Sequence, residues 1–229
     1  ACVLDRLAPL GLAVADLERS AAFYGDALGL PPADAGASPV GDGGALAYPV
    51  GDAALVLRRP TGRPRGGAHV HYALTAPADA LGEWRERLAG LDPHEEEFGS
   101  FRSLYVYDPD DHCVEVAAAG EPADADLTGV FEVVLEVRDL AAAERTYRAL
   151  GFEPVDRGEE RRRVRLRGPT DLELWEPQVG LAGARGGVHV DLGFVTDADA
   201  VEDGRDREPV SDGVRVFDRD GHALTFRRP

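Results

Sequence analysis

The sequence contains no lysine, isoleucine, asparagine or methionine, and it has only two cysteines in 229 residues. Lysine, isoleucine and asparagine share AT-rich codons, so their joint absence indicates a GC-rich genome. Two cysteines are too few for a disulfide scaffold. No apolar run approaches the roughly 18 residues that cross a bilayer, and no secretory signal is visible. We therefore expect a soluble cytoplasmic protein.

Positive charge is also scarce. The chain has 25 basic residues, all arginine, against 42 aspartates and glutamates, which gives a net charge of −17. Such a surface repels nucleic acid and anionic membranes, so we expect neither as a partner. It favours a halophilic protein in a salty cytoplasm, where counterions screen the repulsion. An acidic mesophilic protein from a GC-rich genome is the alternative. The expected partner is a small-molecule substrate or ligand, and a homodimer stays open.

What the sequence does contain is an internal repeat. Residues 69–74 resemble residues 189–194, and the turn at residues 108–110 resembles the one at residues 218–220. A helix that Asp16 would cap has its counterpart in one that Asp139 would cap. The repeated segments occur in the same order in both halves, which indicates an internal duplication.

Residue periodicity predicts the elements within each half. Alternating patterns predict strands, and apolar spacing of three and four residues predicts helices. The expected strands are 7–14, 45–50, 53–58, 69–74, 95–98, 103–107, 113–117 and 131–137, and the expected helices are 16–28, 79–88, 139–150 and a short one at 197–202. The order is close to β-α-β-β-β, which predicts an α+β fold of four βαβββ modules.

The acidic, small-residue stretch 120–128 contains Pro122 and is typical of a linker. We therefore expect a first domain at 1–119 and a second, trimmed domain at 129–229, each with two modules.

Several motifs together resemble those of a known superfamily. They are Val14 through Tyr24 with Leu28-Gly29-Leu30, then His69, and then Asp108-Pro109-Asp110 through Glu115. This ordered set resembles the vicinal oxygen chelate superfamily, which includes glyoxalase I, bleomycin-resistance proteins and extradiol dioxygenases. It is most similar to a two-domain catechol 2,3-dioxygenase with degenerate metal sites. The resemblance implies modules that pair into half-barrels around a cavity for a divalent metal, with Fe(II) or Mn(II) favoured here and no metal as the alternative.

The resemblance implies that His69 and Glu115 bind the metal in the first half. Pro9 stands seven residues before Asp16, where the family usually has its first histidine, and proline has no side-chain ligand. A two-histidine, one-carboxylate face leaves open positions on which a substrate with two adjacent oxygens can chelate.

Two further residues are candidates for catalysis. Tyr105 matches a tyrosine that extradiol enzymes place beside the substrate. His71 lies one strand step from His69 on the same face and suits an acid, a base or a substitute ligand. Phe98 stands where such enzymes often have another acid/base histidine.

The second half carries an alternative ligand set. Glu132 and His189 hold the equivalent positions, but Thr225 replaces the final carboxylate. Glu173 is a substitute, which gives a Glu132, Glu173 and His189 set suited to a hard divalent metal.

The remaining polar residues suggest simpler roles. His94, His112 and His222 fall in loops or turns, where we expect them at the surface. The run Arg161–Arg163 follows two glutamates and is more typical of a solvated hairpin than of an anion site.

Two functions follow from the sequence. One is a metal-dependent, extradiol-dioxygenase-like enzyme that acts on a small catechol-like substrate, with His71 or Tyr105 moving protons. The other is a metal-free protein that sequesters a planar ligand, as bleomycin-resistance proteins do. An isomerase or epimerase that uses Glu132 and Glu173 is a third possibility.

Overall fold

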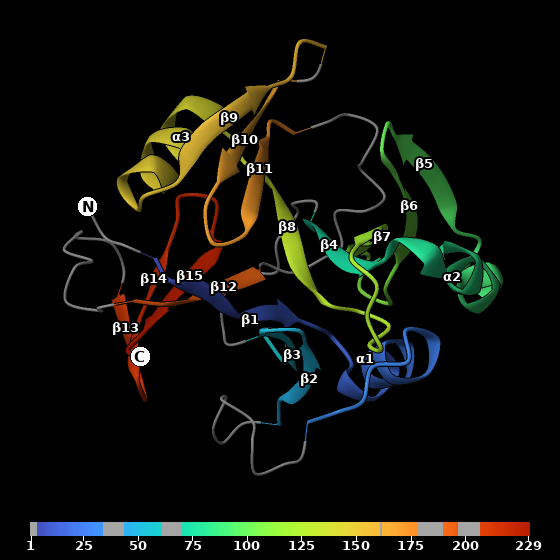
Figure 1. Ribbon diagram of the computed structural model, residues 1–229. Helices are drawn as coiled ribbons and strands as arrows, with labels where there is room; N and C mark the ends of the chain where they lie inside the picture. The colour runs from blue at the N-terminus through green and yellow to red at the C-terminus, as the bar shows by residue number, and fades with distance from the viewer. Residues whose placement is uncertain (1–3, 34–43, 61–69, 161, 178–189, 197–206) are drawn as a thin grey trace.

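The computed structural model describes residues 4–33, 44–60, 70–160, 162–177, 190–196 and 207–229 (Figure 1). Within these ranges the chain forms two sheets of 7 and 8 strands with few helices, which confirms the expected α+β fold. His69, His189 and the short helix expected at residues 197–202 lie outside the described residues.

The first half contains β1 (Arg6–Ala13), α1 (Leu17–Ala22) with a π-helical turn (Phe23–Ala27), β2 (Leu46–Val50), β3 (Ala53–Arg58), β4 (Val70–Pro77), α2 (Leu81–Leu88), β5 (His94–Phe98), β6 (Phe101–Tyr107) and β7 (Cys113–Gly120). The second half contains β8 (Gly129–Glu136), α3 (Leu140–Ala149), β9 (Glu153–Arg157), β10 (Arg163–Arg167), β11 (Asp171–Trp175), β12 (Val190–Val195), β13 (Arg207–Val210), β14 (Gly213–Phe217) and β15 (Ala223–Arg227).

Two of the helices begin at the predicted capping residues. The Asp16 side chain accepts hydrogen bonds from the backbone N–H groups of Glu18 and Arg19, and the Asp139 side chain accepts one from Ala142. These bonds satisfy donors that a helix start leaves unpaired. In the described part of the chain, no helix is long and apolar enough to cross a membrane.

The strands of the two halves are shared between the two sheets. Sheet A has the order β13-β14-β15-β12-β1-β3-β2, and sheet B has the order β5-β6-β7-β4-β8-β11-β10-β9. Sheet A therefore joins the first module to the fourth, and sheet B joins the second to the third (Figure 1). Residues 1–119 and 129–229 do not each form a sheet of their own, because both sheets use strands from both halves.

An antiparallel strand pair at the centre of each sheet makes this connection. In sheet A, Gly11 of β1 lies opposite Asp191 of β12. In sheet B, Ala73 of β4 lies opposite Glu132 of β8. On either side of each central pair the next strand is parallel, so each sheet has approximate twofold symmetry.

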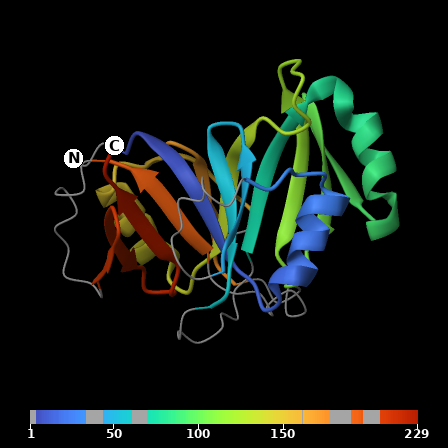
Figure 2. The same cartoon turned by 90° about the horizontal axis from the view of Figure 1, so that it is seen from below.

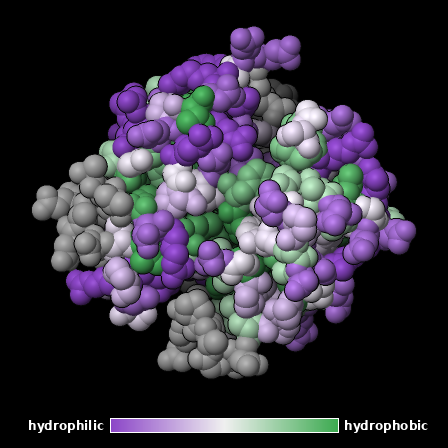
Figure 3. Space-filling view, viewed as in Figure 1, coloured by the Kyte–Doolittle hydropathy of each residue, from purple (hydrophilic) through white to green (hydrophobic). Residues whose placement is uncertain are grey.

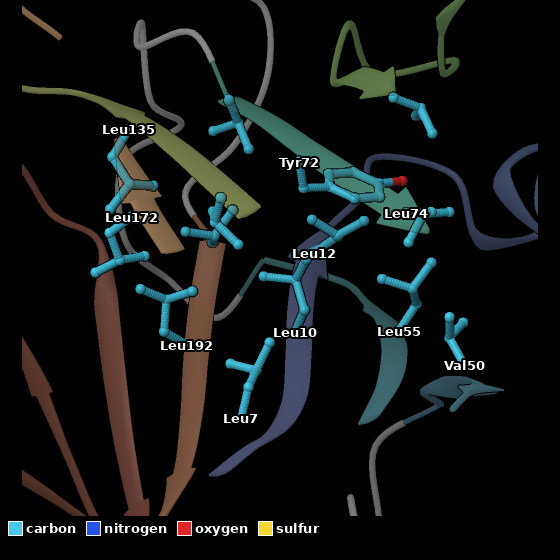
Figure 4. Packing of buried hydrophobic residues seen from close by; sticks show 14 of the residues in the cluster. Leu7, Leu10, Leu12, Val50, Leu55, Tyr72, Leu74, Leu135, Leu172 and Leu192 are labelled. Carbon is cyan, nitrogen blue, oxygen red and sulfur yellow. The ribbon is translucent and has the colours of Figure 1, made fainter. Parts of the chain in front are cut away.

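One face of each sheet packs into a shared apolar core. Leu10 and Leu12 of β1, Leu192 of β12 and Leu74 of β4 are fully buried in this cluster, with Tyr72 of β4 beside them (Figure 4). Each such leucine contributes about 1.5–3 kcal/mol by leaving water. Because strand side chains alternate, the intervening residues of β4 face the opposite side of sheet B.

The aspartate turns lock neighbouring modules together. Asp108 accepts hydrogen bonds from the Tyr24 hydroxyl at 2.8 Å and from the backbone N–H of His112 at 2.9 Å. In the duplicate, Asp218 accepts bonds from the Tyr147 hydroxyl at 3.0 Å and the backbone N–H of His222 at 2.8 Å. Each aspartate thus ties the helix of one module to the turn of the next module in the chain. Figure 2 shows the helix of the first module, in blue, beside the green strands of the second.

The surface positions predicted for two histidines are wrong. His112 and His222 are both fully buried. His112 Nδ1 lies 2.8 Å from Asp108 Oδ2, and His222 Nε2 lies 3.3 Å from the backbone oxygen of Glu136. Each turn packs against the helix of the preceding module, so the histidine in the turn is buried.

Candidate functional site

Four candidate residues occupy matched positions in the middle of sheet B. On β4 and β7, His71 pairs with Cys113, and Ala73 pairs with Glu115. On β8 and β11, Glu132 pairs with Asp171, and Val134 pairs with Glu173. By this register, Glu132 is the counterpart of His71, and Glu173 is the counterpart of Glu115.

These side chains lie on one face of sheet B and line a cavity of about 1020 Å³. His71, Glu115, Glu132 and Glu173 are all at least nine-tenths buried. The cavity wall extends from β5 to β10, so sheet B surrounds it. Besides these four, it is lined by Leu91, Asp92, His94, Glu96, Phe98, Phe101, Tyr105, Val106, Tyr107, Cys113, Phe131, Arg163, Arg165 and Trp175.

The cavity combines two candidate sets that the sequence suggested for separate halves. Glu115, His71 and Tyr105 come from the first half, and Glu132 and Glu173 come from the second. Pro9 and Thr225 belong to sheet A instead, where Pro9 packs against Gly193.

His71 and Glu115 form a buried pair. His71 Nε2 lies 2.8 Å from Glu115 Oε2, and the Ser103 hydroxyl donates to Glu115 Oε1 at 2.5 Å. Tyr105 also hydrogen-bonds to this carboxylate. Burial raises the pKa of Glu115, but these hydrogen bonds and the attraction of His71 outweigh burial and hold the pKa below its ordinary value.

Glu132 is held more weakly. Its nearest described cation is Arg165, whose Nη2 lies 3.3 Å from Glu132 Oε2, while Arg165 Nε donates to Asp171 at 3.0 Å. Burial, together with repulsion from Glu173, raises the pKa of Glu132 to about 7 against the opposing effect of Arg165. A carboxylic acid that titrates near neutrality is suited to hydrogen-bond donation or proton transfer.

Glu173 has two close partners that the sequence analysis missed as site residues. Arg163 Nη1 lies 2.7 Å from Glu173 Oε1, and Trp175 Nε1 donates to Glu173 Oε2 at 2.6 Å. Arg163 was part of the run expected to be a solvated hairpin, and this is wrong for Arg163 because its guanidinium enters the cavity wall. Alternation along β10 places Arg163 and Arg165 on one face, which is the signal that would have identified them.

The divalent metal that the resemblance implies needs several donor atoms that face one point. Histidine and carboxylates are suitable ligands in kind. However, Arg163 and Arg165 occupy positions against Glu173 and Glu132. Among the described residues, no group of three or more His, Cys, Asp or Glu side chains is arranged to hold a metal. The described side chains as arranged therefore do not form a metal site by themselves, and the predicted ligands His69 and His189 lie outside the described residues.

Sheet A holds a closed ionic cluster at the corresponding place. Asp191 of β12 matches the position of His71 in β4. Its carboxylate lies 2.8 Å from Arg58 Nη2 and 2.9 Å from Arg215 Nη2, and it accepts a bond from the Thr225 hydroxyl at 2.6 Å. In this cluster two arginines neutralise a buried acid.

Comparison with known proteins supports the fold. Residues 6–116 match the family model for the Glyoxalase/Bleomycin resistance protein/Dioxygenase superfamily. A candidate dioxygenase from Bacillus subtilis subsp. subtilis str. 168 superimposes with a TM-score of 0.72 at 17% identity, over 100% of this chain and 86% of that one. Glyoxalase I from Zea mays superimposes with a TM-score of 0.64 at 18% identity, over 97% and 92% of the two chains. No curated protein matches the chain in sequence.

Proposed function

We propose that this chain, which carries a domain of the glyoxalase/bleomycin resistance/dioxygenase superfamily, binds a small planar organic molecule in the sheet B cavity without a metal. The observation that carries this proposal is the pairing of the buried acids. Glu115 is held by His71, Ser103 and Tyr105, and Glu173 is held by Arg163. The protein's own side chains thus supply the positive charge and donors that a metal would supply.

The walls of the cavity suit a flat ligand. The rings of His71 and Tyr105 lie edge to face with centroids 5.5 Å apart, and those of His71 and Trp175 lie 6.3 Å apart. Phe98 and Phe101 stack at 5.4 Å near the tip of the β5–β6 hairpin. Aromatic surfaces of this kind hold planar molecules by stacking. In Figure 3, hydrophilic residues cover most of the visible face, and apolar ones gather along its middle.

A metal-dependent, extradiol-dioxygenase-like enzyme is the second candidate. The observation that favours it is the placement of His71, Glu115, Glu132 and Glu173 at matched positions on four adjacent strands of one cavity. In this candidate Fe(II) or Mn(II) is bound by His69 and Glu115, His71 and Tyr105 are the catalytic residues, and a catechol-like molecule is the substrate. If Glu132 and Glu173 bind the metal instead, the arginines that face them must move away.

Metal analysis distinguishes the two candidates. The protein is purified anaerobically without chelator, and its metal content is measured by plasma mass spectrometry beside that of His69→Ala and Glu115→Ala. We expect no stoichiometric metal in any of the three. Stoichiometric iron or manganese that disappears in both variants would favour the enzyme and call for a catechol-cleavage assay.

Binding is measured by intrinsic fluorescence, because the chain has only two tryptophans, Trp84 and Trp175. Trp84 is a buried residue of α2 and does not line the cavity, whereas Trp175 does. In a Trp84→Phe background, planar aromatic compounds are expected to quench the remaining tryptophan in a saturable manner. Absence of saturable quenching across a panel of such compounds would contradict the binding proposal.

A further inference from the structure

The cavity in sheet B is acidic. Among the described residues, five carboxylates, two arginines and two histidines line it. The carboxylates are Asp92, Glu96, Glu115, Glu132 and Glu173.

The two arginines do not neutralise even the inner acids fully. Arg163 also pairs with Asp156 at 2.8 Å, and Arg165 also pairs with Asp171 at 3.0 Å. Neither of these aspartates lines the cavity, so each arginine divides its charge between the cavity and its surroundings. The interior therefore presents an excess of negative charge to a ligand.

The same cavity gathers aromatic rings. The chain has 8 phenylalanines, 6 tyrosines and 2 tryptophans, and six of these side chains line this single cavity. They are Phe98, Phe101, Tyr105, Tyr107, Phe131 and Trp175. Phe98 and Tyr107 are nearly half exposed, so their rings are accessible to a ligand in the cavity.

We infer that the ligand of this cavity is a planar organic cation whose positive group binds Glu132 and whose rings lie against the aromatic walls. This inference rests on the proposed function, since it names the chemical class of the molecule bound there. Ring faces attract cations, and buried carboxylates attract them more strongly. A neutral planar molecule gains only the stacking, and an anion is repelled by the carboxylates.

Glu132 is the inner acid with room for another partner. Glu115 already has three partners, and Glu173 has two within 2.7 Å, whereas the described cation nearest to Glu132 is 3.3 Å away and shared with Asp171. Glu132 lies on β8, which is one of the two central strands of sheet B. An ammonium group beside it adds the charge pairing that Arg165 supplies only in part.

Isothermal titration calorimetry with three probes of one shape tests the inference. The probes are naphthalen-1-ylmethylamine, naphthalene-1-methanol and 1-naphthoate, which differ mainly in charge. Titrations are run at one salt concentration with EDTA present, so that trace metals do not bridge ligand and protein. We expect the amine to bind at least about tenfold more tightly than the alcohol, which corresponds to about 1.4 kcal/mol, and the naphthoate to bind weakest.

Matched variants test whether Glu132 is the carboxylate that binds the ammonium group. Glu132→Gln is expected to bring the amine-to-alcohol ratio close to one while changing the alcohol's affinity less than about threefold. Glu97→Gln removes one negative charge from β5 outside the cavity lining, and it is expected to leave the ratio unchanged. Circular dichroism melting confirms that each variant is folded, and Glu132→Asp, which keeps the charge, is expected to keep a preference for the amine.

The outcomes distinguish a failure of the cation inference from a failure of the proposed binding function. If the alcohol or the naphthoate binds as tightly as the amine, the cation inference is overturned while the binding function stands. If Glu132→Gln keeps the full preference for the amine, Glu132 is not the acid that recognises the charge, and the inference as stated fails. If none of the probes binds, both the inference and the proposed function fail.

Discussion

His71 Nε2 lies 2.8 Å from Glu115 Oε2, and both side chains are more than nine-tenths buried. Removing the imidazole by His71→Ala leaves Glu115 with only Ser103 and Tyr105 as donors. We expect the free energy of unfolding to fall by about 3 kcal/mol, because a buried carboxylate that loses a hydrogen-bond partner is costly. Urea denaturation at pH 7 measures the loss, and a loss below about 1 kcal/mol would show that the pair contributes little.

The same pair predicts that the free energy of unfolding depends on pH in the acidic range. The pKa of Glu115 in the folded state lies below its ordinary value, so the unfolded state binds the proton first as pH falls. The stability that its ionised form contributes is complete above about pH 5 and is lost as pH falls through the folded-state pKa. The difference in unfolding free energy between the wild type and Glu115→Gln is therefore expected to shrink below pH 4. A constant difference from pH 7 to pH 3 would contradict this.

Glu132 predicts the opposite dependence of the free energy of unfolding on pH. Its pKa rises from 4.5 to about 7 on folding, so the folded state binds more protons between these values. This contribution to stability is complete below about pH 4.5 and is lost as pH rises to 7. We expect Glu132→Gln to become more stable than the wild type by about 2–3 kcal/mol as pH rises from 4.5 to 8. Paired chemical denaturation curves across this range measure the difference, and equal slopes for the two proteins would refute it.

The internal duplication provides a matched pair of tyrosines. The Tyr24 hydroxyl is fully buried, donates to Asp108 at 2.8 Å and lies 2.6 Å from the Tyr72 hydroxyl, whereas the Tyr147 hydroxyl donates to Asp218 at 3.0 Å. We expect Tyr24→Phe to cost about 2–3 kcal/mol and Tyr147→Phe about 1.5 kcal/mol, because hydrogen bonds to a buried charged group are worth that much. Thermal melts of both variants measure the two losses of stability, and a larger loss for Tyr147→Phe than for Tyr24→Phe would contradict the prediction.

Gly51 and Gly99 have the same backbone conformation, and alanine substitutions there distinguish the cost of a left-handed backbone from the cost of a steric clash. Gly51 and Gly99 have φ values of +56° and +59°. A Cβ at Gly51 would lie 1.9 Å from the backbone oxygen of Thr128, whereas a Cβ at Gly99 has nothing within 4 Å. Gly99→Ala is therefore expected to cost about 1–2 kcal/mol from the left-handed backbone alone. Gly51→Ala is expected to cost clearly more, because the β2–β3 turn must move away from Thr128. Equal melting temperatures for the two variants would show that the turn adapts freely.

The net charge of −17 predicts dependence on salt. Raising KCl from 0.1 M to 1 M shortens the screening length from about 10 Å to about 3 Å and weakens the repulsion among surface carboxylates. We expect the melting temperature to rise over this range. Sodium sulfate at equal ionic strength, compared with KCl, separates screening from general salting-out. A melting temperature that falls with KCl would oppose the halophilic prediction.

The fold could be predicted from the sequence because its signals are local. The capping residues Asp16 and Asp139, the alternating strands and the repeated aspartate turns each depend on a few neighbouring residues. The pairing of the modules was harder, since the four opening strands have similar patterns. Whether β4 pairs with β8 or β1 pairs with β4 depends on burial between segments far apart in the chain.

The same limit explains what the sequence missed at the site. Because β4 pairs with β8, Glu132 comes to lie in the cavity with His71. The contacts of Arg163 with Glu173 and of Arg165 with Glu132 form within the third module, but the cavity that these arginines line is completed only by this pairing. The burial of His112 and His222 likewise follows from helices that pack over the turns, which no local pattern records.

The exchange of strands between the halves also governs how the chain is made. β1 ends at Ala13 and its antiparallel partner β12 begins only at Val190, so sheet A stays incomplete until the strands between them have left the ribosome. During that time β1 and β4 each have an edge that awaits a strand still to be synthesised. Open edges next to apolar faces recruit other chains, so translation of this protein places an early demand on chaperones. A chain that terminates at the linker would aggregate rather than fold as half of the molecule.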